Sequence, residues 1–329
     1  MAVRIGVGLG LGGFPFENIN EFRRWIDVCE DSEIDSIWQS DRVVSRDPAL
    51  EPLTLLSIIA GATQRLKFGT NAVVLPFRDP ITFARQCATL DYLSDGRFLP
   101  TVAIGRGDAP EWEATGRSPK GRGARADEAL EVITHLWRGE DVDFEGKYFS
   151  LKGATISPRP KQQPLPLWLG GSSKAAIRRT ARYGTGWLAP LQTPKEAGDS
   201  VRAIRAESRA IGRPIPDDHY GATILFRIGD KVELPDLSGE RPPAKQQNDV
   251  QDGPSRKNPN GDAAQEMRAR ISGIQAMGEP SEVLSRIREF VENGVTKFIA
   301  IPLARNAADM NEQCRLLATE VIPYANNRD

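Results

Sequence analysis

Apolar residues follow two alternating patterns along this 329-residue chain. Short apolar runs rich in β-branched residues predict strands, and longer segments with apolar residues every three or four positions predict helices. The predicted strands are residues 3–9, 36–39, 66–74, 98–105, 165–169, 186–189, 221–228 and 297–301. The helices predicted between them are residues 21–30, 53–63, 81–93, 123–137, 175–182, 194–211, 282–292 and 310–322. Strict alternation indicates a parallel sheet, and eight pairs favour a (β/α)8 TIM barrel with insertions over an open, doubly wound sheet.

Two segments interrupt this alternation. Residues 139–164 place two aromatic pairs around a glycine turn, which predicts a hairpin-like excursion from the barrel. Residues 229–262 are crowded with proline, glutamine, asparagine, aspartate and lysine, which predicts a flexible insertion at the rim of the active site. The chain length does not demand a second domain, because barrels of this kind commonly reach it as one. We therefore predict a single domain over residues 1–329.

The amino-acid composition argues against binding to polyanions such as nucleic acid and anionic membranes. Hydrophobic residues make up 40% of the chain, enough for a sizeable core, and 43 Lys and Arg residues balance 44 Asp and Glu residues. With no global field to hold a polyanion, the chain is expected to bind neither nucleic acid nor an anionic membrane. The first residues show no basic segment followed by a long apolar run, and no stretch reaches membrane-spanning length, so we expect a cytoplasmic protein.

Cysteines and histidines are too few and too scattered for metal or triad chemistry. Cys29, Cys87 and Cys314 each lie in an apolar-periodic segment without CxxC spacing, which indicates buried packing. His135 and His219 are the only histidines and lie far apart in the chain. A zinc cluster or a Ser-His-Asp triad therefore has almost nothing to be built from, and we expect no metal site.

Polar residues and glycines follow several predicted strands at the ends that form the pocket of a barrel enzyme. The second strand is followed by Asp41 and Arg42. The third contains Thr70, Asn71 and Ala72, and the fourth closes with Gly105, Arg106, Gly107 and Asp108. Glycines of the first strand, Gly6 among them, suggest backbone lying flat beneath a ring. The alternative for these charged residues is a set of surface ion pairs of little energetic weight.

The end of the fifth strand predicts an anion site. Gly170, Gly171, Ser172 and Ser173 precede a helix-forming segment, so freed backbone amides, two hydroxyls and a helix N-terminus can cradle a phosphate. A tight turn with a serine cap is the alternative interpretation. Trp187 on the next strand could wall a planar ring, or could be plain core.

A dinucleotide-binding turn is rejected at residues 8–13. The spacing of the glycines matches G-x-G-x-x-G and follows a strand. That motif needs its last glycine to open a helix, whereas here a Phe-Pro-Phe segment intervenes and the helical pattern starts only near Glu21. The glycines therefore do not predict a Rossmann fold.

Several segments, in order along the chain, resemble the luciferase-like monooxygenase family. SIWQSDR at residues 36–42 is similar to a family segment that ends in Ser-Asp-His. The matches continue with the third-strand block at residues 68–80, the segment LDYLSDGRF at 90–98, residues 122–137, and the blocks at 166–173 and 181–187. No single match is specific, but as an ordered set they are.

The resemblance implies a barrel that binds FMN or the deazaflavin coenzyme F-420 in its mouth and transfers a hydride to or from a small-molecule substrate, with oxygen activation in the FMN branch. It places the phosphate near Gly170 and the ring beside Asp41 and a non-prolyl cis peptide at Asn71-Ala72. By analogy with the family we also expect a homodimer.

Two departures from the family pattern bear on mechanism. Arg42 replaces the expected histidine, and Arg106 stands where deazaflavin sugar-phosphate dehydrogenases have an acid. The form of residues 105–108 looks more like reductase-type deazaflavin relatives. We hypothesise that Asp41 orients the coenzyme and relays a proton, while Arg42 or Arg106 binds an acidic part of substrate or coenzyme. A flavin-binding barrel without turnover, or another phosphate-binding barrel enzyme such as an aldolase or isomerase, remains the alternative.

Overall fold

The computed structural model describes residues 2–10, 14–45, 48–230, 232 and 270–326. The insertion predicted at residues 229–262 therefore lies outside the described residues, apart from its first two positions and residue 232. In the described part of the chain, no helix is long and apolar enough to cross a membrane.

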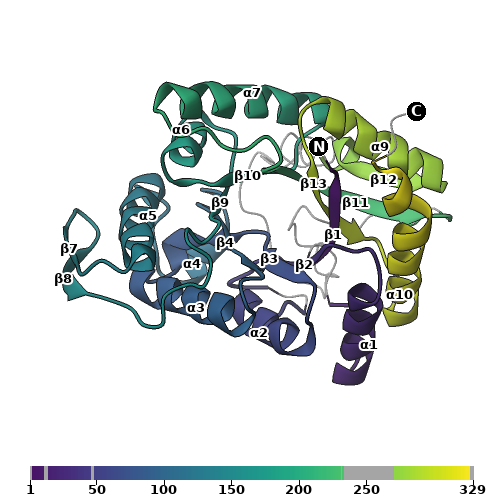
Figure 1. The fold of residues 1–329 in the computed structure, drawn as a ribbon, viewed down its shortest axis with the longest axis horizontal. Coiled ribbons are helices and arrows are strands. Elements are labelled where there is room, and N and C mark those ends of the chain that lie inside the picture. Colours follow the sequence, from purple (N-terminus) through teal and green to yellow (C-terminus); the bar gives the residue numbers. More distant parts are fainter. Residues whose placement is uncertain (1, 11–13, 46–47, 231, 233–269, 327–329) are drawn as a thin grey trace, which may run out of the picture.

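Parallel strands form a strongly curled sheet that closes on itself, with helices around it (Figure 1). Its strands are β1 (Arg4–Leu9), β2 (Ser36–Gln39), β3 (Lys67–Thr70), β4 (Val73–Val74), β5 (Phe98–Leu99), β6 (Thr101–Ala103), β9 (Trp168–Gly170), β10 (Gly186–Ala189), β11 (Tyr220–Ile228) and β13 (Lys297–Pro302). The path runs β4-β6-β9-β10-β11-β13-β1-β2-β3-β5. Because β4 continues β3 and β6 continues β5, the two ends of the path are the same pair of strands. The predicted barrel is confirmed.

In the part of the chain that the structure describes, the eight predicted helices surround the sheet. They are α1 (Ile19–Glu30), α2 (Pro52–Ala62), α3 (Pro80–Leu93), α5 (Arg122–Arg138), α6 (Lys174–Tyr183), α7 (Pro194–Ala210), α9 (Pro280–Glu292) and α10 (Ala307–Leu316). Side chains begin several of them as the sequence rules require: Asn18 caps α1, and Thr193 and Glu196 form a capping box on α7. All eight predictions are confirmed, with ends that shift by a few residues.

A short α-helix and a short strand in the described part of the chain were not predicted. The helix α4 (Glu111–Ala114) follows β6, and β12 (Gln275–Gly278) pairs in parallel with β11 outside the closed circuit. Each is four residues long, too short for a periodic pattern to distinguish it from a loop.

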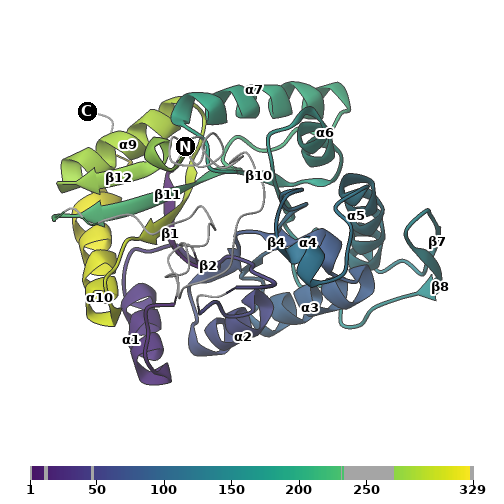
Figure 2. The ribbon, with the colours of Figure 1, turned by 180° about the vertical axis from the view of Figure 1, so that it is seen from behind.

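The excursion at residues 139–164 is a hairpin, as predicted. Strands β7 (Val142–Glu145) and β8 (Ser150–Ala154) pair antiparallel and stand at the edge of the molecule in both views (Figure 2). The carboxylate of Glu128 on α5 accepts the backbone N–H groups of Lys147, Tyr148 and Phe149. The hairpin tip is therefore fixed to the first half of α5.

Charged groups close the amino-terminal end of the barrel interior. The Lys297 ammonium, 3% exposed, donates to the carboxylate of Asp35 and to the Ser36 hydroxyl at 2.7 Å, and lies 5.7 Å from the centre of the Trp38 ring. Burial, with a smaller contribution from Arg4, lowers the pKa of Lys297 well below its usual range. The positive charge of the buried Lys297 side chain therefore depends on the carboxylate of Asp35 for its neutralisation.

Candidate active site at the carboxyl end of the barrel

The strand ends that carry most of the predicted site residues lie next to one another. The pairings of β2 with β3, β4 with β6 and β6 with β9 bring together the loops that follow these strands. At this end Asn71, Ala72, Gly105, Gly170 and Gly171 are partly exposed. Arg42, Arg106, Gly107, Asp108, Ser172 and Ser173 are exposed. The structure thus gathers these positions at one mouth, as the sequence predicts for a barrel enzyme.

Three predicted residues lie elsewhere. Gly6 lies deeper in the barrel, where an added Cβ would come within 2.1 Å of the Ser36 hydroxyl oxygen and 3.0 Å of the Trp38 ring nitrogen. The side chain of Thr70 is fully buried, and its hydroxyl both donates to the Thr101 carbonyl oxygen (2.6 Å) and accepts the Thr101 N–H (2.8 Å). Trp187 has no exposed surface. The core alternative fits Trp187 better than a wall of the mouth.

A hydrogen bond across the barrel forms a polar floor beneath the mouth. The Asn71 amide donates to the Thr223 hydroxyl at 3.1 Å, and the third and seventh strands stand on opposite sides of an eight-stranded circuit. The cis peptide that the family resemblance implied is present between Asn71 and Ala72. Thr223 was not among the predicted residues. Its signal in the sequence was a hydroxyl side chain in a mostly apolar strand, at an inward-facing position of the alternation.

A buried hydroxyl at the mouth has no partner in the described part of the protein. Ser40 is 6% exposed, and its Oγ atom makes no hydrogen bond. A Cβ on Gly10 would lie 2.9 Å from the Ser40 Cβ, so this hydroxyl stands against the glycine at the end of β1. Buried polar groups are nearly always hydrogen-bonded, so an orphaned hydroxyl here fits a polar atom of a bound molecule.

The carboxylate of Asp41 forms its hydrogen bonds with other groups of the protein. Its side chain is 1% exposed and accepts hydrogen bonds from the backbone N–H of Val74 (3.0 Å) and the guanidinium of Arg78 (2.9 Å). Burial raises the pKa of Asp41, although the Arg78 charge and the Val74 N–H oppose this shift. Arg78 also lies 3.5 Å from Glu51. The geometry assigns Asp41 to holding the segment after Ala72, and its predicted proton transfer stays a prediction.

The turn after β9 has the form that an anion site needs. Gly171 has a φ of +115°, and Ser173 caps α6 by accepting the Ala176 N–H at 3.2 Å. From outside the barrel, the Trp187 indole donates to the Gly171 carbonyl oxygen at 2.8 Å. Trp187 therefore supports this turn, while Ser172 and Ser173 remain exposed on it.

The N-terminus of α5 is fixed beside that of α6. Arg179 of α6, nearly buried, donates to the Asp127 carboxylate at 2.6 Å and to the Gly123 carbonyl oxygen at 3.2 Å. Both acceptors belong to the first turns of α5. Two helix N-termini, each with a partial positive charge, thus open at the same side of the mouth.

Arg122 adds a full charge to these helix ends. It is the first residue of α5, where the helix dipole disfavours a cation, and the first turn has no acidic residue. Its guanidinium lies against Gly107 and makes only long hydrogen bonds, at 3.4 Å, to the carbonyl oxygens of Gly105 and Pro119. Among the described residues no carboxylate forms an ion pair with it. We define the turn 170–173, the two helix N-termini and Arg122 as the anion corner. Sequence reasoning missed Arg122, although a basic first residue of a helix after glycine was a signal.

Arg106 and Asp108 pair with each other at the rim. Their side chains are 58% and 68% exposed and lie 2.7 Å apart. The hydrogen bond from Arg106 is the main cause that lowers the pKa of Asp108. Such an exposed pair contributes only about 0 to 1 kcal/mol, so a ligand could readily exchange for either partner. In the described residues no three His, Cys, Asp or Glu side chains cluster as metal ligands would.

Comparison with known proteins gives a family and a fold. The profile described as luciferase-like monooxygenase matches residues 1–297. An uncharacterized protein of Mycobacterium tuberculosis (strain ATCC 25618 / H37Rv) is 30% identical over 206 residues, which is 60% of this chain and 69% of that protein.

Two solved structures share the fold over nearly the whole chain. The coenzyme F-420 dependent tetrahydromethanopterin reductase from Methanopyrus kandleri has a TM-score of 0.73 at 20% identity, covering 99% of this chain and 100% of that one. The oxygenating constituent of 3,6-diketocamphane monooxygenase from Pseudomonas putida, in complex with FMN, has a TM-score of 0.74 at 15% identity, covering 98% and 99%. At these identities the likeness concerns the fold alone.

Proposed function

Because the chain belongs to the luciferase-like monooxygenase family, we propose that it is an oxidoreductase that binds FMN or coenzyme F-420 at the carboxyl end of the barrel. Its reaction would be hydride transfer between this coenzyme and a small organic substrate. The anion corner is the observation that carries the proposal, because it offers a phosphate two helix N-termini and a guanidinium that forms no ion pair within the described residues. Relatives whose fold matches this one include a coenzyme F-420 dependent reductase and a monooxygenase in complex with FMN.

The residues at the mouth fit such a coenzyme. The phosphate would lie at the turn 170–173 and Arg122, and the ring beside Ala72 over the floor formed by Asn71 and Thr223. The Ser40 hydroxyl would satisfy its hydrogen-bonding capacity on a polar edge of the bound molecule. When bound, a flavin or deazaflavin accepts or donates the hydride, and the protein supplies binding, orientation and electrostatics. We favour the deazaflavin on the form of residues 105–108.

Titration of the purified protein with each coenzyme tests the proposal. We expect saturable binding of FMN or F-420, followed by the change in coenzyme fluorescence, and competition by high concentrations of inorganic phosphate at the anion corner. Binding of neither coenzyme would overturn the proposal. Bleaching of the bound coenzyme by hydride donors, followed by stopped flow, then separates an enzyme from a flavin-binding barrel without turnover.

Replacing Asp41 by asparagine should weaken coenzyme binding and turnover together. The amide keeps one acceptor but loses the charge opposite Arg78, so the backbone around Val74 loses part of its support. Loss of a hydrogen bond to a charged group costs about 1.5–3 kcal/mol of unfolding free energy. Coenzyme titration, steady-state kinetics and denaturant unfolding measure the three effects.

The matched control for this variant is Asp31→Asn at the exposed end of α1, which should leave all three measurements unchanged. If Asp41→Asn kept full turnover and full coenzyme affinity, neither the orienting role nor the supporting role of Asp41 would stand.

A further inference from the structure

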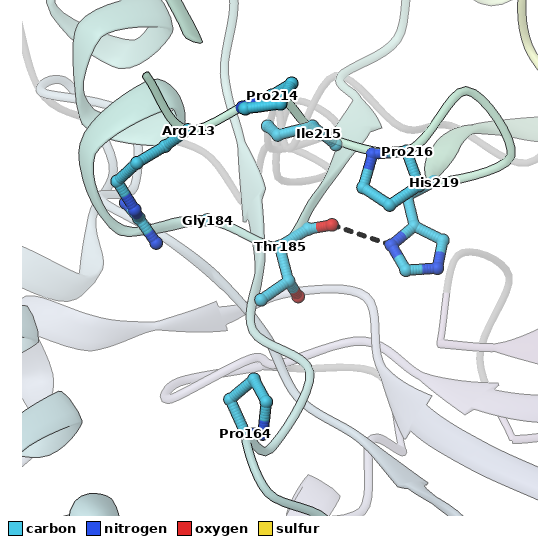
Figure 3. Close-up of a pocket in the computed structure, with 8 residues that line it drawn as sticks. All are labelled: Pro164, Gly184, Thr185, Arg213, Pro214, Ile215, Pro216 and His219. Atoms are coloured by element: carbon cyan, nitrogen blue, oxygen red, sulfur yellow. Dashed lines mark hydrogen bonds between the residues drawn. The ribbon is translucent and has the colours of Figure 1, made fainter. Parts of the chain in front are cut away.

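Two cavities lie at the amino-terminal face of the barrel, opposite the mouth. Their volumes are about 350 and 380 Å³, and both are lined by Pro164, Thr185 and Arg213. Figure 3 shows the first cavity, between the loop before β11 and the loop before β10. The second extends from there to the C-terminal end of α5. Since they share these residues, we treat them as one groove with two chambers, the basal groove.

The charged side chains that line the basal groove are arginines, and one histidine, His219, lies beside them. Neither chamber is lined by an aspartate or glutamate, whereas Arg138 lines one chamber and Arg213 lines both. Arg213 donates to the Ala181 carbonyl oxygen at 3.2 Å and has no carboxylate partner among the described residues. A guanidinium that faces a cavity without a counter-charge attracts an anion and can bind a carboxylate through two N–H groups.

The rest of the lining mixes apolar side chains with the polar side chains of Thr134, Gln163, Tyr183 and Thr185. Ile215 lines one chamber, and Leu165, Leu167 and Trp137 line the other, all of them buried. The volumes lie near the lower end of the range of about 300–1,000 Å³ that is usual for small-molecule sites. The groove therefore suits a small molecule with an apolar body and one anionic group, rather than a bare inorganic anion.

We propose that the basal groove binds a small organic carboxylate, with its carboxylate on Arg213 and its apolar body against the buried leucine or isoleucine side chains. This site is separate from the coenzyme mouth, because its lining comes from segments that precede β9, β10 and β11 and from the C-terminal ends of α5 and α6. The inference holds whichever coenzyme the mouth takes, and whether or not it takes one.

Benzoate and its neutral isostere benzamide are suitable probes. We expect saturable benzoate binding to the coenzyme-free protein by calorimetry, with amide chemical-shift changes at Thr185 and Ile215. Benzamide should bind about tenfold more weakly or worse, because it cannot form the charge-assisted pair. Arg213→Gln should weaken benzoate binding by about tenfold or more and leave benzamide binding unchanged.

The matched control is Arg209→Gln, which removes an exposed arginine of α7 that does not line the groove. It should leave benzoate affinity within about twofold, since screening reduces the effect of a distant surface charge. Equal binding of benzoate and benzamide, equal loss in the two arginine variants, or shift changes confined to the mouth would each overturn the proposal. Circular dichroism establishes that both variants fold.

Discussion

Replacing Arg122 by glutamine is expected to weaken coenzyme binding by roughly 10- to 100-fold, the equivalent of one charge-assisted hydrogen bond to a phosphate. In the protein as described, the guanidinium makes only two long hydrogen bonds to carbonyl oxygens and no ion pair. Removing it therefore costs little folding free energy. The loss should fall on binding, because the two helix N-termini alone retain only partial charges.

Fluorescence titration of the variant against the unaltered protein measures this effect. Arg138→Gln is the control, since it removes a cation from the last turn of the same helix, at the opposite end of the barrel. The affinity of the unaltered protein should fall as salt rises, and the Arg122 variant should show a shallower dependence. Equal affinity in Arg122→Gln and the unaltered protein would remove Arg122 from the anion corner.

Replacing Asp35 by alanine should lower the free energy of unfolding by about 3 kcal/mol, because it leaves the Lys297 ammonium buried without its counter-charge. Lys297 is 3% exposed, whereas Asp35 is 22% exposed and can reach water. Removing the other partner should therefore cost much less: Lys297→Met keeps the apolar stem and leaves a carboxylate that solvent can reach. We expect Lys297→Met to lie within about 1 kcal/mol of the unaltered protein, as measured by denaturant unfolding.

The Asp35 variant should also gain stability as pH rises. Burial already lowers the pKa of Lys297 in the folded state, and loss of the carboxylate that forms an ion pair with it should lower this pKa further. Between the lowered folded-state pKa of Lys297 and pH about 10.4, the unfolded chain then binds more protons than the folded one, so the free energy of unfolding increases with pH across this window. Between pH about 7 and 10, the free energy of unfolding should rise more steeply with pH for Asp35→Ala than for the unaltered protein. A parallel dependence in both proteins would show that Asp35 does not compensate Lys297.

The sequence alone predicted the order of elements because strands and helices follow local periodicity. Eight strands and eight helices stand where the apolar patterns placed them, and strand ends that meet at one face of a barrel brought residues 105–108 and 170–173 together. The family resemblance added the cis peptide between Asn71 and Ala72, which no periodicity contains.

Only the tertiary structure decided which side chains form hydrogen bonds and ion pairs with one another. The hydrogen bond between Asn71 and Thr223 joins residues 152 positions apart, and the pairing with Arg78 gives Asp41, a predicted coenzyme ligand, the further role of supporting the backbone. Arg122 became a candidate phosphate ligand only because Arg179 holds the start of α5 beside the start of α6. The physical reason is range: backbone propensity and burial periodicity act within a few residues, whereas charge compensation and hydrogen-bond partners depend on distances that exist only after the barrel has closed.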